Sequence, residues 1–371
     1  MKIGMVLPGF SANEKDWCIP ALLDLVRTLA RENSIHVFAL EYPYRRDDYA
    51  VFGAAVHSLD GRNRGKAYAP RLWTTAFAAI RAEHRRGRFD LLHAFWANEP
   101  GLLALLAARA LRIPVVASVA GGELAALRDI DYGGQRHGVE RVMIRTVIQN
   151  ADCVTVGSRY LQRLALPYRS KIEIQPLGVD TTMFSPVQRK HTKPVRLLNV
   201  GSLVPVKAHA ALLDTVAKLG SSGICLEIVG AGTLQDELSR QSAALGISTQ
   251  VKFSDSIPHQ LMAENYRAAD LFVQAARHES QGMALLEAAA CGTAIAGTPV
   301  GVLPELAEKG AVVAARGFHA DDLAAAIVEA LEMREQLGCR AREIAAREFD
   351  LETTCSNWTH LYQAMLHPRP A

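Results

Sequence analysis

The chain has 371 residues, of which 49% are hydrophobic and 21% are charged, and its formal net charge is +3. This length suits two domains of ordinary size, and the composition is that of a globular protein. It contains no apolar run of about 18 residues, so no membrane-spanning helix is expected. The six cysteines are scattered without a C-x-x-C pair, which argues against a disulfide framework or a zinc site and favours a reducing, cytoplasmic location.

The charge is unevenly distributed. Residues 1–190 carry 26 Lys+Arg and 18 Asp+Glu, whereas residues 191–371 carry 15 and 20. The basic segments of the first half lie at 45–46, 62–71 and 81–88. They fit an anionic acceptor or peripheral contact with an anionic inner membrane face, and equally arginines spread over solvated helices. Nucleic acid is not expected as a partner, because these segments lack interleaved aromatic residues.

Short apolar runs alternate with amphipathic stretches, which predicts parallel sheets covered by helices. In the first half we expect strands at 2–7, 35–40, 91–95, 115–119 and 154–157. Helices are expected at 21–31, 72–86, 101–111 and 139–150. The polar, proline-bearing stretch at 178–194 indicates a linker.

The same alternation restarts beyond this stretch. Strands are expected at 196–200, 225–229, 251–253, 271–274, 294–297 and 311–314. Helices are expected at 208–219, 234–245, 260–268, 283–291, 303–308, 321–336, 340–349 and 352–366. Two Rossmann-like halves of this kind predict a ligand in the cleft at the carboxyl ends of the strands.

The most informative segment surrounds Glu279 and Glu287, which stand eight positions apart. If a helix begins at Met283, the N–H groups of Gln281, Gly282 and Met283 point outward and can bind an anion. Glu287 then lies about one turn inside the helix, within an apolar run where a half-buried carboxylate needs a partner. A nucleotide-sugar site needs a phosphate-binding position beside two acceptors for sugar hydroxyls.

This segment resembles the E-x7-E region of the retaining GT-B glycosyltransferases of family four. The matching residues are Glu279, Gly282, Leu286, Glu287, Ala288, Ala290, Gly292, Val300, Gly301, Pro304 and Glu305. The resemblance implies an α/β protein of GT-B fold, with two Rossmann-like domains whose parallel sheets face each other across a cleft. It implies a donor sugar held at Glu279 and a ribose at Glu287. The donor-side loop would be Gln281, Gly282, Met283 and Ala284, of which Gln281 and Met283 depart from the family pattern.

A second matching segment contains Lys207, where the family grips the diphosphate with Arg and Lys. Ser202 replaces that Arg and Ala208 replaces a Gly. A hydroxyl is not equivalent to a guanidinium, so either another cation, with Arg277 a candidate, or the helix start must compensate. The resemblance thus implies that Glu279 and Lys207 are the catalytic residues.

Two further turns extend the resemblance. Gly230 and Gly232 follow a strand near the nucleotide, although Gln235 occupies the third glycine position of a dinucleotide fingerprint and so argues against NAD. Ser256 and Ile257 follow the next strand, where the family reads the base through its backbone. Because backbone recognition of the base leaves no side-chain pattern, the sequence does not identify the base. It does not identify the donor sugar or the acceptor either.

On the acceptor or phosphate side, Gly9 and Phe10 follow the first strand, where the family often has a glycine pair. Gly121 and Glu123 keep the family's H-G-x-D/E pattern, with Ala120 in place of the His. His93 closes another strand and is either an acceptor contact or a hydrogen-bonded structural residue. The resemblance implies an acceptor domain at 1–190, a donor domain at 191–351 and a final helix, 352–371, that packs back on the first domain.

Together these features predict a retaining glycosyltransferase that moves a hexosyl unit from a nucleoside diphosphate sugar to a hydroxyl acceptor, whether glycan, lipid-linked or small. The nucleotide sugar is a co-substrate, and no cofactor or metal is expected. Asp129 and Asp131 form a D-x-D pattern, but no partner ligands accompany it. The alternatives are an NAD-type oxidoreductase, a GT-B enzyme of other chemistry and a non-catalytic nucleotide-sugar binding protein.

Overall fold

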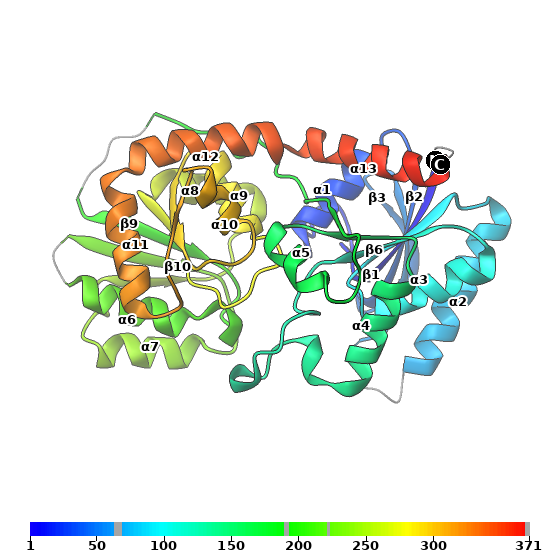
Figure 1. Ribbon diagram of the computed structural model, residues 1–371, viewed down its shortest axis with the longest axis horizontal. Helices are drawn as coiled ribbons and strands as arrows, with labels where there is room; N and C mark the ends of the chain where they lie inside the picture. Colours follow the sequence, from blue (N-terminus) through cyan, green and yellow to red (C-terminus); the bar gives the residue numbers. More distant parts are fainter. Residues whose placement is uncertain (63–68, 189–192, 221–222, 368–371) are drawn as a thin grey trace. The chain divides into compact units, whose positions relative to one another are not determined.

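The computed structural model describes residues 1–62, 69–188, 193–220 and 223–367. The chain divides into two compact units (Figure 1): unit 1 comprises Met1–Gly178 and Leu351–Ala371, and unit 2 comprises Val179–Asp350. The domain boundary expected at 190/191 lies outside the described residues, as do 63–68 of the second basic segment and the last four residues of the expected final helix. Each unit is an α/β structure with a largely parallel sheet, so the predicted fold class is confirmed.

The sheet of unit 1 has the strand order β3-β4-β2-β1-β5-β6-β7-β8. Its strands are β1 (Lys2–Gly9), β2 (Ser34–Tyr42), β3 (Arg46–Val51), β4 (Ala54–Leu59), β5 (Leu91–Phe95), β6 (Val115–Val119), β7 (Cys153–Val156) and β8 (Glu173–Ile174). All neighbouring pairs are parallel except β3 and β4.

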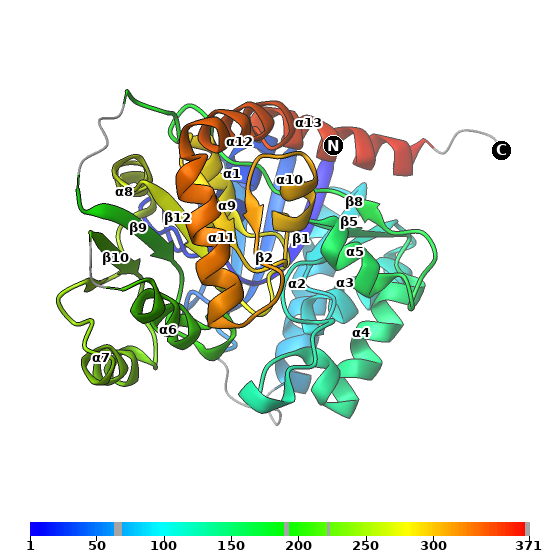
Figure 2. The same ribbon diagram turned by 60° about the vertical axis from the view of Figure 1, so that its left-hand side comes forward.

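Helices cover both faces of this sheet (Figure 2). One hydrophobic core lies under α1 (Pro20–Leu29) and α13 (Leu351–Leu366). The other lies under α2 (Ala69–Arg86), α3 (Glu99–Leu111), α4 (Gly138–Asn150) and α5 (Arg159–Ala165). In α13, Trp358 is fully buried and its indole N–H donates to the carbonyl of Pro176 at 3.2 Å, which anchors the final helix in unit 1.

The hairpin β3–β4 was not indicated by the sequence. Its turn is Phe52 and Gly53, with φ of 46° and 83°. Two-residue hairpin turns of type I′ need positive φ at both central positions, which are usually occupied by Asn-Gly or Asp-Gly. The outer strand β3 is largely exposed and charged, as edge strands often are, and therefore lacks apolar alternation.

The sheet of unit 2 is parallel throughout, in the order β11-β10-β9-β12-β13-β14. Its strands are β9 (Val195–Val200), β10 (Ile224–Val229), β11 (Val251–Ser254), β12 (Leu271–Gln274), β13 (Ala294–Gly297) and β14 (Val313–Ala314). One face is covered by α6 (His209–Leu219), α7 (Gln235–Ala244) and α11 (Ala320–Glu332). The other is covered by α8 (Met262–Ala268), α9 (Met283–Ala290), α10 (Leu303–Glu308) and α12 (Arg334–Glu348).

The helices expected at 321–336 and 340–349 are divided differently in the structure. α11 ends at Glu332 and α12 already begins at Arg334, so Gly338 lies inside α12. A Cβ at Gly338 would lie 2.3 Å from the carbonyl oxygen of Gly292. This glycine therefore permits a close approach between backbones and does not interrupt the helix.

Both sheets contain a point at which the strand order reverses. In unit 2 the chain builds outward from β9 to β11 and then crosses back to β12, so the reversal lies between β9 and β12. In unit 1 the reversal lies between β1 and β5. Ligands of open α/β sheets bind at the carboxyl ends of the strands at such points. No helix within the described residues is long and apolar enough to cross a membrane.

Candidate active site

The start of α9 forms the centre of the candidate site. The helix begins at Met283, as predicted, and its N-cap is Gly282 with φ of 100°. Glycine adopts this left-handed conformation without a steric penalty. Gly282 has no side chain with which to cap this end. The first amides of a helix have no intrahelical acceptor, so those of Met283 and Ala284 can donate to an anion, which the helix dipole also favours.

Glu287, one turn into α9, is only 8% exposed and has two side-chain partners. Its Oε1 lies 3.0 Å from Nε2 of His259, and its Oε2 accepts a 2.7 Å hydrogen bond from the hydroxyl of Tyr266. The expectation that this carboxylate needs a partner is confirmed. A carboxylate offers about four acceptor positions, so two remain for hydroxyl groups of a ligand.

His259 and Tyr266 contact Glu287, and the sequence analysis did not single them out. Burial, followed by the neighbouring Glu287, raises the pKa of Tyr266 well above its ordinary value, so its hydroxyl stays protonated and donates. A buried tyrosine hydroxyl usually has a hydrogen-bond partner, and that rule was the available signal. His259 follows Ser256 and Ile257, so the expected base-reading segment lies beside Glu287; Ser256 is exposed and Ile257 is half-buried.

Lys207 and Glu279 form an ion pair. Both side chains are mostly buried, at 29% and 17% exposed, so the attraction is screened less than at an open surface. Lys207 ends a short 3-10 turn, Pro205–Lys207, and Ala208 follows in the left-handed conformation with φ of 52°. This backbone conformation explains why glycine is the family's usual residue at the position of Ala208.

Backbone hydrogen bonds join the loops at the carboxyl ends of β9, β10, β11, β12 and β13. The amide of Arg277 donates to Val206 O at 2.8 Å, and the amide of Val302 donates to Gln281 O at 2.8 Å. The amide of Gly230 donates to Ser254 O at 3.0 Å. The first of these bonds joins the loop that carries Glu279 to the turn that carries Lys207.

The glycines after β10 have a packing role. A Cβ at Gly230 would lie 2.1 Å from Gly201 O, and one at Gly232 would lie 2.4 Å from Leu203 O. Both positions therefore require glycine for the close approach of two loops. Ser202, in the neighbouring loop, is exposed.

In unit 1, the first strand runs to Gly9, two residues beyond its expected end at residue 7, and a Cβ at Gly9 would lie 3.1 Å from Cβ of Tyr42. The side chain of Phe10 is 1% exposed and belongs to the core under α1 and α13. Its amide donates to Tyr42 O at 3.1 Å. The sequence analysis assigned Phe10 to the acceptor or phosphate side, whereas its ring fills the core.

His93 is a structural residue, and the alternative of an acceptor contact is corrected. It is fully buried, with Nδ1 2.8 Å from the hydroxyl of Tyr362 and Nε2 2.8 Å from Oγ of Ser118. Both ring nitrogens are thus occupied inside the core. Burial lowers the pKa of His93 to about 3, so the ring is neutral at ordinary pH.

Glu123 is also buried, at 2% exposed, and accepts hydrogen bonds from three backbone amides. Its Oε1 accepts from Ala97 at 3.0 Å and Ala120 at 3.1 Å, and its Oε2 accepts from Gly121 at 2.6 Å. Desolvation raises the pKa of Glu123, although these amides act in the opposite direction. Glu123 therefore shapes the loops after β5 and β6, and its oxygens are committed to the backbone.

These loops border a cavity of about 230 Å³ in unit 1. Its lining includes Trp96, Asn98, Glu123, Tyr132, Arg136 and His137. Asp131 of the D-x-D pattern lies there too, paired with Arg136. The cavity thus lies at the carboxyl ends of the strands and offers an aromatic ring beside polar groups.

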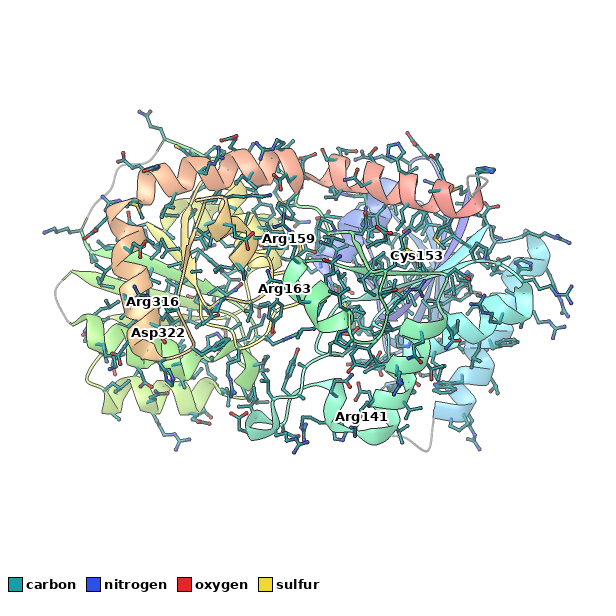
Figure 3. The ribbon with its side chains drawn as sticks, in the orientation of Figure 1. Arg141, Cys153, Arg159, Arg163, Arg316 and Asp322 are labelled. Carbon is teal, nitrogen blue, oxygen red and sulfur yellow. The ribbon has the colours of Figure 1, made fainter. Side chains whose placement is uncertain are left out.

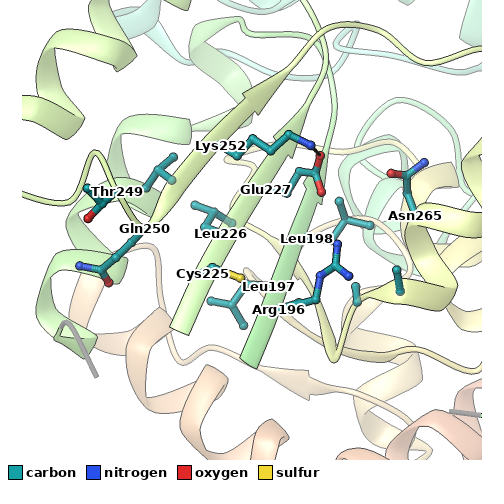
Figure 4. Close-up of a pocket in the computed structure, with 13 residues that line it drawn as sticks. Arg196, Leu197, Leu198, Cys225, Leu226, Glu227, Thr249, Gln250, Lys252 and Asn265 are labelled. Atoms are coloured by element: carbon teal, nitrogen blue, oxygen red, sulfur yellow. Dashed lines mark hydrogen bonds and ion pairs between the residues drawn. The ribbon is translucent and has the colours of Figure 1, made fainter. Parts of the chain in front are cut away.

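A second cavity, of about 220 Å³, lies in unit 2 (Figure 4). Arg196, Cys225 and Gln250 line it at or near the beginnings of β9, β10 and β11, and Lys252 pairs with Glu227 at its edge. Ligands of such sheets bind at the opposite, carboxyl ends. None of the candidate donor-site residues lines this cavity.

Comparison with known proteins agrees with this geometry. The family described as Glycosyltransferase Family 4 matches residues 21–183, and that described as Glycosyl transferases group 1 matches residues 180–346. A D-inositol 3-phosphate glycosyltransferase from Geodermatophilus obscurus is 29% identical over 319 residues, covering 79% of this chain and 70% of that protein. One from Mycolicibacterium smegmatis is 28% identical over 340 residues, covering 81% and 74%. The solved sucrose-phosphate synthase from Thermosynechococcus elongatus has a TM-score of 0.82 at 19% identity over the whole of both chains.

The fold and these matches define a GT-B glycosyltransferase. The chain belongs to the group 1 glycosyltransferases of family four, and it is an enzyme that transfers a sugar from a nucleotide sugar to an acceptor. The prediction of this activity is confirmed, and the NAD-type oxidoreductase is set aside.

The burial of His93 predicts an acid-sensitive fold. Its pKa is about 3 in the folded state against 6.5 ordinarily, so the unfolded chain binds the proton more readily. The resulting stability is present above about pH 6.5 and is lost as the pH falls toward 3.

His93→Gln should reduce the pH slope of the unfolding free energy in this window by up to about 1.4 kcal/mol per pH unit. Urea unfolding between pH 6.5 and 4 measures this slope, and the exposed His360→Gln should leave it unchanged. An unaltered slope in His93→Gln would contradict the assignment.

Proposed function

We propose that the enzyme transfers a hexosyl unit from a nucleoside diphosphate sugar to a hydroxyl acceptor with retention of anomeric configuration. The observation that carries this proposal is the convergence of Lys207, Glu279, Glu287 and the start of α9 at the strand reversal of unit 2. Two carboxylates, one ammonium and a row of amides match the groups of a sugar, a ribose and a diphosphate.

In this proposal, the diphosphate lies at the amides of Met283 and Ala284 and beside Lys207. Negative charge develops on the leaving diphosphate as the glycosidic bond breaks. Fixed amides and an ammonium that already point toward that charge stabilise it without reorganisation. Transfer then needs no metal, because these groups supply the positive charge that a metal would supply elsewhere.

Lys207 is paired with Glu279. A bound diphosphate would provide a second anion for the ammonium, and the Glu279 carboxylate would then accept hydrogen bonds from the sugar hydroxyls. The ion pair thus orients both side chains. Glu287 would bind the ribose hydroxyls while His259 and Tyr266 hold its orientation.

We place the acceptor beside the loops that carry Gly121 and Glu123. The adjoining cavity of about 230 Å³ has the volume of a single sugar ring or similar polyol, and Trp96 offers it an aromatic face. Arg136 and His137 in the lining would suit an anionic substituent. The relatives' name, with a phosphorylated inositol in it, supports an acceptor of this chemical class.

Glu287→Gln should weaken the binding of nucleoside diphosphate. The substitution removes the charge from an acceptor of two hydroxyl hydrogen bonds, each worth about 1.5–3 kcal/mol to a charged partner. The dissociation constant should rise at least roughly 10-fold. Calorimetry with whichever of UDP, GDP and ADP binds the unmodified enzyme measures this change. Glu329→Gln, an exposed position on α11, is the control and should bind normally. Equal affinity in both variants would contradict the ribose role.

The stereochemistry of transfer tests retention. From an α-linked donor we expect an α-linked product, which the anomeric coupling constants in proton NMR identify.

Lys207→Met should lower kcat by roughly 100-fold, because one preorganised donor to the developing charge is lost. Lys218→Met, which removes a surface partner of Asp321, should keep full activity. A β-linked product, or an active Lys207→Met enzyme, would overturn this part of the proposal.

We further propose that unit 1 contacts an anionic membrane surface through α4. Val139 and Val142 are 73% and 65% exposed on this helix, and Arg141 and Arg145 are exposed beside them. Figure 3 shows Arg141 projecting from α4. Apolar side chains that insert between lipids and arginines that meet anionic headgroups form an interfacial helix face.

The double variant Val139→Asp with Val142→Asp should bind vesicles containing phosphatidylglycerol several-fold more weakly than the unmodified enzyme. Carboxylates on this face lose the apolar contact and repel anionic lipid. Co-sedimentation at low and high salt measures binding, which should fall with salt. Val328→Asp, an exposed position on α11 of unit 2, is the matched control. Membrane contact through α4 would be rejected if both proteins sediment equally with the vesicles.

A further inference from the structure

Three polar side chains from separate elements meet inside unit 1. His36 lies on β2, His57 on β4 and Glu83 near the end of α2. One ring nitrogen of each histidine and one carboxylate oxygen all lie within 4.8 Å of one another. His57 and Glu83 are only 8% and 7% exposed. A hydrogen bond links the two imidazoles, and the carboxylate of Glu83 lies beside them.

The distances suit a single metal ion. Nδ1 of His36 lies 3.2 Å from Nε2 of His57 and 3.8 Å from Oε2 of Glu83. Two nitrogens bound at about 2.0–2.1 Å to a tetrahedral zinc ion lie roughly 3.3–3.4 Å apart. The two histidine nitrogens therefore already have nearly the required separation, whereas the Glu83 carboxylate, which lies within 4.8 Å of both, must move closer to share one ion with them.

Asp48 on β3 orients one of these ligands. Its Oδ1 lies 2.7 Å from Nδ1 of His57, so the proton of that ring is held on Nδ1 and the lone pair of Nε2 faces His36. Metal-binding histidines commonly donate their other N–H to a carboxylate in this way. The rings of His36 and His57 are also stacked, with 5.5 Å between their centroids and 9° between their planes.

The remaining charged groups around the cluster leave the ligand atoms accessible. Arg86 pairs with Oε1 of Glu83, which leaves Oε2 toward His36, and Arg86 is itself 74% exposed. Lys2 donates to the carbonyls of Glu83 and Gly87.

We propose that His36, His57 and Glu83 bind one zinc-type divalent ion, with water at the fourth position. The ion would join β2, β4 and α2, three elements distant in sequence, and would stabilise unit 1. Imidazole nitrogen with carboxylate oxygen is a ligand set of zinc and similar transition metals, whereas magnesium prefers oxygen ligands and water. The proposal is independent of sugar transfer.

The test uses the full chain after dialysis against a chelator. Titration with Co²⁺ should give one equivalent of binding with the intense visible bands of a tetrahedral site, and Zn²⁺ should abolish them by displacement. Zn²⁺ should raise the melting temperature, whereas Mg²⁺ should not. An unmodified protein that binds no stoichiometric Co²⁺, or binds it without tetrahedral bands, would overturn the proposal without recourse to any variant.

Variants locate the ion. His57→Gln and Glu83→Gln should lose the cobalt bands, whereas the exposed His360→Gln should retain them. Asp48→Asn should keep the bands but weaken binding by about 10–100-fold, because it perturbs only the orientation of His57. Circular dichroism verifies that each variant is folded. Unchanged metal binding in folded His57→Gln and Glu83→Gln would place the ion elsewhere and reject this site.

Discussion

The pairing of β9 with β12 is the constraint on which the donor site depends. Leu271 lies opposite Leu197 in parallel register, although the two strands are separated in sequence by β10 and β11. Because parallel neighbours end at the same edge of a sheet, the loop after β9 must meet the loop after β12. Lys207 and Glu279 are carried on these loops, so their ion pair follows directly from the order of the strands.

The rest of the site is supported from that edge. Loop-to-loop backbone bonds, such as that from Arg277 to Val206, hold the charged residues in register, and glycines at 230 and 232 allow the loops to approach. The buried carboxylate of Glu287 is stabilised by His259 and Tyr266 from a third loop and a neighbouring helix. Charges that are prearranged in this way respond to a diphosphate with little reorganisation, which is the physical basis of the proposed transfer.

Much of this arrangement could be predicted from local patterns. The start of α9, the strand at 271–274 and the helix at 303–308 are where periodicity and glycine punctuation indicate them. The errors occurred where tertiary contacts overrule a local signal. Gly338 lies inside a helix because it packs against Gly292, and the edge strand β3 lacks apolar alternation because its side chains face solvent. His93 follows the pattern of a ligand-facing residue, yet its strand points it into the core.

By itself, the sequence determined the α/β class, the family and the identities of the two glutamates and the lysine, because these depend on short-range spacing and on residue chemistry. Only the tertiary structure decided that Lys207 pairs with Glu279, that Tyr266 holds Glu287, and that His36, His57 and Glu83 meet. Those contacts join residues tens of positions apart, so the local periodicity of apolar residues does not predict them. They arise from the order and register in which the strands pair, which side-chain patterns along one chain do not specify.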